Sequence, residues 1–301
     1  MTRPKTTLEQ WAVLASVVDR GGFAAAAQAL HRSQSAVSYA VARLQQSLGM
    51  PLLGLEGRRA VLTPHGQTLL RRARPLLQEL VTLEELAMSL HRGWEPQLRL
   101  VVDLAFPRER LLRIVSELGA ACPHTQLQLE DVVLSGAEEA IIGRSADVVV
   151  TSRVPADVLG EFLFEVSFVA VAHPGHALFG LQRPLAAGDL AHHTQAVVRD
   201  SGRQQPRDEG WLGAERRFTV SSMEASLAIV TAGLAFAWLP EHLVAPAIGA
   251  GGARALPLVS GATRRVPLYL VLVHGPVAGP AAREAANSFA RHRPLTPGVA
   301  A

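Results

Sequence analysis

Residues 23–49 read FAAAAQALHRSQSAVSYAVARLQQSLG, and this segment predicts two helices joined by a tight polar turn. The first helix is short and alanine-rich, from about Phe23 to Leu30, and His31-Arg32-Ser33 interrupts it. Ser33 can cap the second helix, whose apolar positions recur at helical spacing until Gly49 closes it. Two helices separated by a turn of about three residues are typical of a helix-turn-helix.

The second of these helices exposes polar side chains on the face opposite its apolar positions. With Ser33 at its start, this face carries Gln34, Ser35, Ser38, Tyr39 and Arg43. Serine and glutamine can donate to and accept from base edges in the major groove of DNA. The alternative is an ordinary three-helix core whose serines only cap and solvate the helices. A preceding helix starts at a capping box formed by Thr7 and Gln10 and ends at Gly21-Gly22.

The segment Met50–Leu62 is short, apolar and rich in turn residues, which indicates a two-stranded wing after the helices. Arg58 and Arg59 fall at the tip of this wing, where they can face phosphate groups or the minor groove.

The order and spacing of four blocks strongly resemble the LysR-type transcriptional regulators. The blocks are Ala24–Leu30, Ser33–Ser38, Leu44 with Leu48-Gly49, and Leu62–Gly66. The resemblance implies a winged helix-turn-helix that binds DNA as a dimer. It places Ser33, Gln34, Ser35, Ser38 and Tyr39 in the groove-reading helix and Arg58 in the wing. Three positions depart from the family, because Leu53 and Leu55 replace its usual Phe and Arg, and Gly22 replaces its usual Ser.

Charge is distributed unevenly along the chain. Residues 1–74 contain ten Lys and Arg against Glu9, Asp19 and Glu56, a net charge of +7, whereas residues 75–301 carry −4. A basic N-terminal region on a mildly acidic body is typical of a polyanion-binding module attached to a second domain. Double-stranded promoter DNA is therefore the expected partner of residues 1–62.

Thr63 and Pro64 predict the start of a long helix that reaches Arg92. Its apolar residues alternate in steps of four and three, as in a coiled coil, and they are Leu69, Ala73, Leu76, Leu80, Leu83, Ala87 and Leu90. Such a seam needs a partner helix, and a second copy of the chain is the simplest one. The alternative is a helix packed on its own domain. Pro75 predicts a kink near Arg71-Arg72, and Gly93–Pro96 predicts a hinge that completes a linker over 63–96.

Residues 97–301 alternate between strand and helix patterns, which predicts an α/β domain built around parallel strands. The resemblance implies two lobes like those of periplasmic binding proteins, with lobe 1 over 97–166 plus 267–301 and lobe 2 over 167–266. The whole chain is thus expected to be α/β, with a mainly α-helical winged helix-turn-helix and a long linker helix in front.

Ligands of such lobes lie at the carboxyl ends of strands and against helix N-termini. This rule selects ten candidate effector-binding residues: Asp103, Phe106, Ser135, Thr151, Ser152, Arg199, Ser201, Ser221, Ser222 and Phe236. Ser221 with Glu224 predicts a capping box. Each residue also has an ordinary structural interpretation, with Ser221 as a cap only, Phe236 as core, and Arg199 with Asp200 as a solvated ion pair.

A buried Asp103 would disfavour an anionic effector unless Arg199 or Arg153 offset its charge. Since Leu104, Phe106 and Phe236 are also expected nearby, a small aromatic or hydroxylated effector is preferred over a simple carboxylate. No cofactor is expected.

Several classes of protein are disfavoured by the sequence. It has no HExxH, Gly-x-Ser-x-Gly or Walker motif, and the adjacent His192 and His193 are poorly placed to chelate a metal, so neither catalysis nor a metal site is expected. The single cysteine, Cys122, excludes an internal disulfide and is expected to be a buried or partly exposed thiol. The sequence shows no signal-peptide core and no membrane-spanning run, which predicts a cytoplasmic protein.

The expected function is therefore a ligand-responsive transcription regulator that forms a homodimer or homotetramer, with RNA polymerase as a further candidate partner. A constitutive regulator without an effector is the main alternative. A solute-binding protein, or an enzyme fused to a DNA-binding domain, is the less favoured one.

Overall fold

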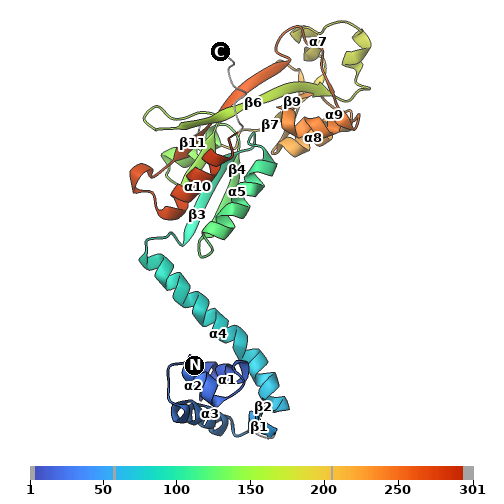
Figure 1. Cartoon of the computed structure of the whole chain (residues 1–301). Coiled ribbons are helices and arrows are strands. Elements are labelled where there is room, and N and C mark those ends of the chain that lie inside the picture. The colour runs from blue at the N-terminus through green and yellow to red at the C-terminus, as the bar shows by residue number, and fades with distance from the viewer. Residues whose placement is uncertain (1–3, 57–58, 205, 294–301) are drawn as a thin grey trace, which may run out of the picture. The chain divides into compact units, whose positions relative to one another are not determined.

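The structure is a computed structural model that describes residues 4–56, 59–204 and 206–293. The chain divides into two compact units, with the boundary between Arg92 and Gly93 (Figure 1). Each unit has its own hydrophobic core.

The first unit contains three short helices followed by a two-stranded sheet. These elements are α1 (Leu8–Asp19), α2 (Phe23–Ala29), α3 (Gln34–Leu48), β1 (Leu53–Glu56) and β2 (Arg59–Leu62). The strands pair in antiparallel fashion as the predicted wing. The predicted caps are confirmed, because the Oγ atoms of Thr7 and Ser33 accept hydrogen bonds from the amides of Gln10 and Ala36, and Gly49 ends α3 at φ +69°.

The long helix α4 (Pro64–His91) completes the first unit and is anchored to it by its first two turns. Thr63 Oγ1 accepts a hydrogen bond from the amide of Gly66 at 3.0 Å. A Cβ at Gly66 would lie 2.1 Å from the carbonyl oxygen of Leu52, so only glycine fits there. The 28 residues of α4 correspond to about 42 Å, and the helix continues past Pro75.

The second unit is built on a seven-stranded mixed sheet. Its strands are β3 (Gln97–Asp103), β4 (Gln126–Val132), β5 (Val148–Thr151), β6 (Glu161–Ala172), β9 (Ala237–Pro240), β10 (Arg254–Ala255) and β11 (Thr263–Leu272). The order is β10-β6-β11-β5-β3-β4, with β9 also pairing with β6. β3 runs parallel to β4 and β5, whereas β11 is antiparallel to β5 and β6.

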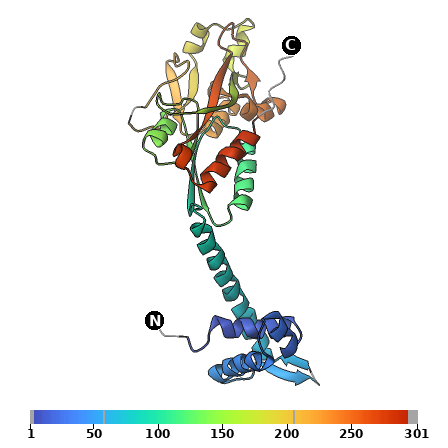
Figure 2. The ribbon, with the colours of Figure 1, turned by 60° about the vertical axis from the view of Figure 1, so that its left-hand side comes forward.

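The helices of this unit form two groups. In the first group, α5 (Arg108–Ala121) and α10 (Pro280–Arg291) pack side by side (Figures 1 and 2), and α6 (Ser135–Ile142) lies against β3 and β5. The second group lies in the part of the chain between β6 and β11, which also contains the parallel pair β7 (Thr194–Val198) and β8 (Arg216–Val220). It consists of α7 (Ala187–Ala191), α8 (Met223–Thr231), α9 (Glu241–Gly249) and a 3-10 helix at Ala177–Leu181, and a short 3-10 turn at Gly275–Val277 precedes α10. Of the second group, α8 packs on both β7 and β8.

The strands β6 and β11 connect the two lobes, because each is long enough to contribute to both. Val166 and Val266, where the sequence analysis divides the lobes, are register partners within this pair. From the sequence pattern, strands are predicted only over residues 167–172 and 268–273, so β6 and β11 are both longer than predicted, and α7 and α9 are not predicted at all.

The predicted hinge over Gly93–Pro96 is held to the second unit at Glu95. The Glu95 carboxylate accepts hydrogen bonds from the amides of Ala281 and Ala282 at 2.9 and 3.2 Å, at the N-terminus of α10. The Glu95 carbonyl accepts a further bond from Thr125 Oγ1 at 2.8 Å. Gly93, at the boundary between the two units, has φ +81°.

Candidate functional site

The helix-turn-helix presents one polar face on α3. The apolar side chains of Val37, Val41 and Leu44 are buried against α1 and α2. The residues predicted to contact bases lie on the opposite face, and all of them are exposed: Ser33, Gln34, Ser35, Ser38, Tyr39 and Arg43. Tyr39 is 67% exposed, although a tyrosine ring usually packs against neighbouring side chains. The structure thus brings these six residues together on one surface.

Ser33 and Arg43 have local partners on this surface. The Ser33 hydroxyl caps α3 and lies 3.0 Å from the Ser35 hydroxyl. Arg43 donates a hydrogen bond to Gln46 Oε1 at 2.9 Å. In the wing, Arg58 lies outside the described residues, and the backbone of Arg59 begins β2 opposite Glu56. The predicted phosphate contacts of these two arginines therefore stay predictions.

The predicted seam of α4 is buried where the helix begins, against the helix-turn-helix, and exposed along the rest of the helix. Ala73 is buried and Leu69 is partly buried. Leu76, Leu83 and Leu90 are 56%, 59% and 46% exposed, and Ala87 is exposed too, while Leu80 is intermediate. Three large apolar side chains at seven-residue spacing along one helix form a surface that favours a partner helix.

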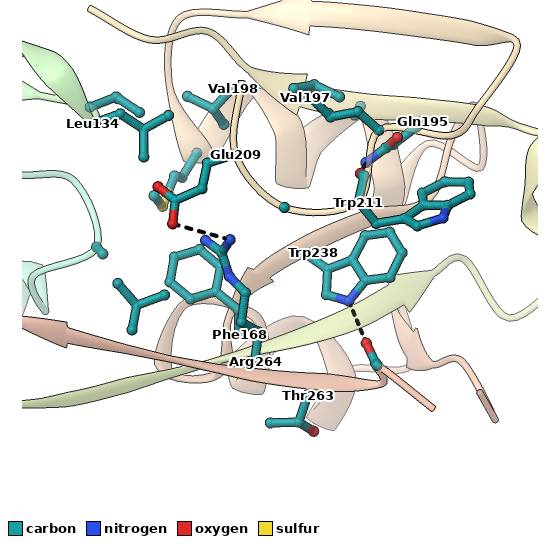
Figure 3. Close-up of a pocket in the computed structure, with 18 of the residues that line it drawn as sticks. Leu134, Phe168, Gln195, Val197, Val198, Glu209, Trp211, Trp238, Thr263 and Arg264 are labelled. Atoms are coloured by element: carbon teal, nitrogen blue, oxygen red, sulfur yellow. Dashed lines mark hydrogen bonds and ion pairs between the residues drawn. The ribbon is translucent and has the colours of Figure 1, made fainter. Parts of the chain in front are cut away.

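A pocket of about 430 Å³ lies between the two lobes of the second unit. Lobe 1 contributes Asp103, Ala105, Val133, Leu134 and Ser152 to its wall, and lobe 2 contributes the remaining residues. Figure 3 shows Gln195, Trp211 and Trp238 near one another, with Phe168 beside Arg264. A volume of this size is within the range that small-molecule sites occupy.

The aromatic part of the pocket is a packed cluster. Trp211 and Trp238 have ring centroids 5.6 Å apart, and both pack against the fully buried Phe236 at 6.0 and 5.9 Å. Trp238 is fixed by a 2.9 Å hydrogen bond from its indole N–H to the carbonyl of Gly261. Gln195 Nε2 donates to the carbonyl of Trp211 at 2.9 Å and so fixes the loop that carries it.

Asp103 is the buried acid of the pocket, at 5% exposure. Its Oδ1 accepts a hydrogen bond from the amide of Ala105 at 2.9 Å, and Ser152 provides a second one. Burial raises the pKa of Asp103 from 3.8 to about 6, because desolvation outweighs these hydrogen bonds. The second acid, Glu209, is exposed and lies 3.6 Å from Arg264, whose guanidinium is 5.6 Å from the centre of the Phe168 ring.

Of the ten predicted effector-binding residues, only Asp103 and Ser152 line this pocket. The two predicted phenylalanines are core residues instead. Phe106 packs against Phe164 and Phe289 at 5.5 and 5.4 Å, and Phe236 supports the tryptophan cluster from beneath. Thr151 is fully buried, and its hydroxyl donates to the carbonyl of Arg153 within a turn.

Ser135 and Ser201 belong to a contact between the lobes rather than to the pocket wall. The carboxylate of Asp200 accepts hydrogen bonds from Ser135 N and Ser135 Oγ at 3.1 and 2.7 Å, and from the amides of Gly202 and Arg207. Ser201 Oγ both accepts from Val133 N and donates to Val133 O. These partners satisfy the N-terminus of α6, so this helix end is occupied by the chain itself.

We call this contact the interlobe clamp: Ser135, Glu138 and Glu139 of α6 with Asp200, Arg203, Gln204 and Arg207. Arg207 pairs with Glu138 through both terminal guanidinium nitrogens, Nη1 and Nη2, and Glu139 accepts from the amides of Arg203 and Gln204. The interpretation of Arg199 and Asp200 as a solvated pair is wrong, because Asp200 is buried at 7% exposure and Arg199 is exposed. Arg199 lines a neighbouring pocket that shares Leu134, Val198 and Glu209 with the main one, but Arg199 is not among the residues that line the main pocket.

The predicted capping box at Ser221 is also wrong. α8 is capped by Ser222, whose Oγ accepts a hydrogen bond from the amide of Ala225 at 3.1 Å. Ser221 is exposed one residue earlier, and neither serine lines the pocket, although Met223 does.

The sequence analysis missed the residues that give the pocket its chemistry, which are Phe168, Gln195, Glu209, Trp211, Trp238 and Arg264. Four of them lie on the strands β6, β7, β9 and β11, and Glu209 and Trp211 lie on the segment between β7 and β8. A usable signal was the concentration of two of the chain's four tryptophans within residues 211–238, in a sequence with only 5% aromatic residues.

Other residue clusters give no sign of a metal or thiol site. Within the ranges that the structure describes, no group of three or more His, Cys, Asp or Glu side chains is arranged to hold a metal ion. Cys122 is buried as expected, and burial together with Glu284 and Glu95 raises the pKa of its thiol. Among the described residues, no helix combines the length and apolar character needed to span a membrane.

A helix-turn-helix with an exposed polar recognition face, followed by a two-lobed domain with a pocket between its lobes, defines a ligand-sensing class of transcription regulator. Residues 8–67 match the family described as bacterial regulatory helix-turn-helix protein, lysR family, and residues 91–293 match the LysR substrate binding domain. The chain belongs to the LysR-type transcriptional regulators.

Individual relatives are similar along most of their length. The probable HTH-type transcriptional regulator YhaJ of Escherichia coli (strain K12) is 32% identical over 253 residues, 82% of this chain and 85% of that protein. The regulator CrgA of Neisseria meningitidis is 30% identical over 86% of this chain and 87% of that protein. The crystal structure of ArgP from Mycobacterium tuberculosis shares the fold, with a TM-score of 0.53 at 22% identity, covering 94% of this chain and 95% of that one.

Proposed function

We propose that this regulator binds an inverted-repeat site in promoter DNA through α3 of two copies, and that a small molecule in the interlobe pocket changes how it binds. The observation that carries the DNA contact is the exposed face of α3, where six hydrogen-bonding side chains gather on the helix that enters the major groove in this motif. The net charge of +7 in residues 1–74 supplies attraction to phosphate groups.

The second copy is supported by α4. Leu76, Leu83 and Leu90 form an exposed apolar row along it, and a second α4 would cover that row. A dimer also matches the two-fold symmetry of an inverted repeat. Further pairing of the second units would give a tetramer, and contact with RNA polymerase would follow from binding at a promoter.

The effector response is supported by the pocket and the interlobe clamp together. The segment 199–211 carries both Asp200, which binds lobe 1, and Glu209 and Trp211, which line the pocket. A molecule that contacts Glu209 or Trp211 therefore acts on the segment that holds the lobes together. Differential affinity for two lobe arrangements is what such a ligand needs in order to shift the equilibrium between them.

No cofactor and no catalytic activity are part of this proposal. The effector is bound and released unchanged, and the regulator acts in the cytoplasm. A constitutive regulator with an unused pocket is the alternative, and it is favoured if no small molecule alters DNA binding.

The double substitution Gln34→Ala/Tyr39→Ala tests the DNA contact. Removing two exposed side chains of α3 should weaken binding to the promoter by at least about tenfold per lost base contact, while the fold stays intact because neither side chain is buried. Gln78→Ala, exposed on α4 outside the seam, is the matched control and should bind like the parent chain. Equal promoter affinity of the double variant and the control, measured by fluorescence anisotropy, would contradict the assignment of α3.

A further inference from the structure

The charges that line the interlobe pocket are unbalanced toward acid. Asp103, Glu209 and Arg264 are its charged residues, and Arg264 already lies 3.6 Å from Glu209. Asp103 has no cation within hydrogen-bonding distance, because its partners are the amide of Ala105 and the Ser152 hydroxyl. A bound carboxylate would therefore meet Asp103 with no free cation to offset the repulsion.

The pocket also contains a buried acceptor without a donor. Gln195 is 4% exposed, and among the described residues no group donates a hydrogen bond to its Oε1. Its orientation is fixed, because Nε2 donates to the carbonyl of Trp211. An unpaired buried acceptor costs about 1–3 kcal/mol, and a ligand with a donor group would satisfy it.

The apolar wall beside these acceptors is aromatic. Trp211 and Trp238 lie next to Gln195 in Figure 3, and their indole rings are held by the Gly261 carbonyl and by Phe236. Fixed aromatic faces bind planar rings by stacking and attract cations through their electron-rich surfaces.

We propose that this pocket selects an arylalkylamine, whose ring packs against Trp211 and Trp238 and whose ammonium group binds Asp103, with a further donor satisfying Gln195. The inference rests on the proposed effector role of the pocket and names the chemical class of the effector. Asp103 has hydrogen-bond donors but no cation in contact with it, and Gln195 Oε1 has no donor among the described residues, so an ammonium group suits the first and a further donor suits the second. Cation–π attraction to the tryptophans acts in the same direction.

Four small probes separate the features of this proposal: 2-phenylethylamine, 2-phenylethanol, 3-phenylpropionate and 2-cyclohexylethylamine. The four probes are similar in size. Relative to 2-phenylethylamine, 2-phenylethanol lacks the positive charge, 3-phenylpropionate carries a negative charge instead, and 2-cyclohexylethylamine lacks the aromatic ring. Each is titrated into the full-length protein by isothermal calorimetry at pH 7.5. 2-Phenylethylamine should bind at least about tenfold more tightly than each of the others, a difference of about 1.4 kcal/mol.

The pH dependence tests the contact with Asp103. The groups that face Asp103 are Ala105 N, the Ser152 hydroxyl, Glu209 and Arg264, and the raised pKa of about 6 means that Asp103 loses its charge between pH 7.5 and 5. The ammonium probe stays protonated over this range, so its affinity should fall about tenfold at pH 5. Asp103→Asn should bind it weakly and without this pH dependence. Asp157→Asn, which removes an exposed acid outside the pocket wall, should behave like the parent chain.

Three results would overturn the proposal: tighter binding of the carboxylate or the alcohol, unchanged amine binding by Asp103→Asn, or no binding of any probe at millimolar concentration. Each leaves the DNA-binding function intact, because promoter affinity is measured separately on the same preparations. Loss of promoter binding together with normal amine binding would instead contradict the proposed function and leave the ligand class standing.

Discussion

At the scale of single residues, the environment of a side chain decides its role more than its position in a motif. Ser33 was identified correctly as a cap because it follows directly on the polar turn that ends the preceding helix. Ser221 and Ser222 are adjacent, both precede a helix, and the sequence pattern favoured the wrong one. Asp103 was predicted at the effector site, and the structure places it, buried, in the wall of the interlobe pocket.

Asp103 should lower the stability of the protein at neutral pH. Its pKa is raised by burial from 3.8 to about 6, so the folded state binds the proton more tightly than the unfolded state. Stability from this group therefore falls as the pH rises from about 4 to 6, and the cost above pH 6 is about 2–3 kcal/mol. Asp103→Asn, which keeps the acceptor for Ala105 N, should be more stable than the parent chain at pH 7.5.

The difference in stability between Asp103→Asn and the parent chain is measured by urea unfolding of the full-length protein without added ligand, followed by tryptophan fluorescence. The advantage of Asp103→Asn should shrink as the pH is lowered from 6 toward 4. A variant that is less stable than the parent at pH 7.5 would show that the ionised carboxylate makes favourable contacts that outweigh its desolvation.

At the scale of secondary-structure elements, periodicity predicted the helices of the first unit and most strands of the second. The strands β6 and β11 were predicted too short, because their missing halves carry charged and exposed residues such as Glu161, Arg264 and Arg265. The pocket wall could not be derived in the same way. Its residues come from segments far apart in the chain, and only the pairing of β6 with β11 and β9 brings them together.

The exposed row on α4 predicts a dimer that a single charge can disrupt. Leu83→Glu places a carboxylate in the middle of the seam, where a partner helix would have to bury it. Light scattering should give the parent chain a mass of at least twice 32.1 kDa, and the variant a mass near that of one chain. Gln78→Glu adds the same charge outside the seam and should stay dimeric. A dimeric Leu83→Glu protein would show that the dimer interface does not lie at the seam of α4.

The interlobe clamp predicts a strong effect of Asp200 on the second unit. Burial alone would raise the pKa of this carboxyl, but hydrogen bonds from Gly202, Ser135 and Arg207 outweigh it and hold the pKa below its ordinary value. Asp200→Ala leaves several of these donors without an acceptor and should destabilise the unit by at least about 2 kcal/mol in urea unfolding at pH 7.5. Asp208→Ala, an exposed neighbour in the same segment, should change stability little. Equal stability of the two variants would show that the interlobe clamp does not stabilise the second unit.

At the scale of the whole molecule, the division of the chain into a DNA-binding unit and an effector-binding unit was easier to predict from the sequence than the residues of either site. The charge asymmetry and the change from helical to alternating strand patterns separate the two units, whose boundary the structure places between Arg92 and Gly93. The exposed polar face of α3 was predictable because its residues follow one another along a single helix and its N-cap. The effector pocket was not, since it needs the folded arrangement of two lobes.

The measurement that tests the central claim most directly is selection of the full-length protein on a library of random double-stranded DNA. A dimer that reads bases through α3 should enrich an inverted repeat whose half-sites are separated by about one or more helical turns, and binding should weaken steeply with salt. Binding that depends on salt but enriches no sequence would contradict base recognition by α3. Enrichment of a single unrepeated half-site would contradict the symmetric dimer through α4.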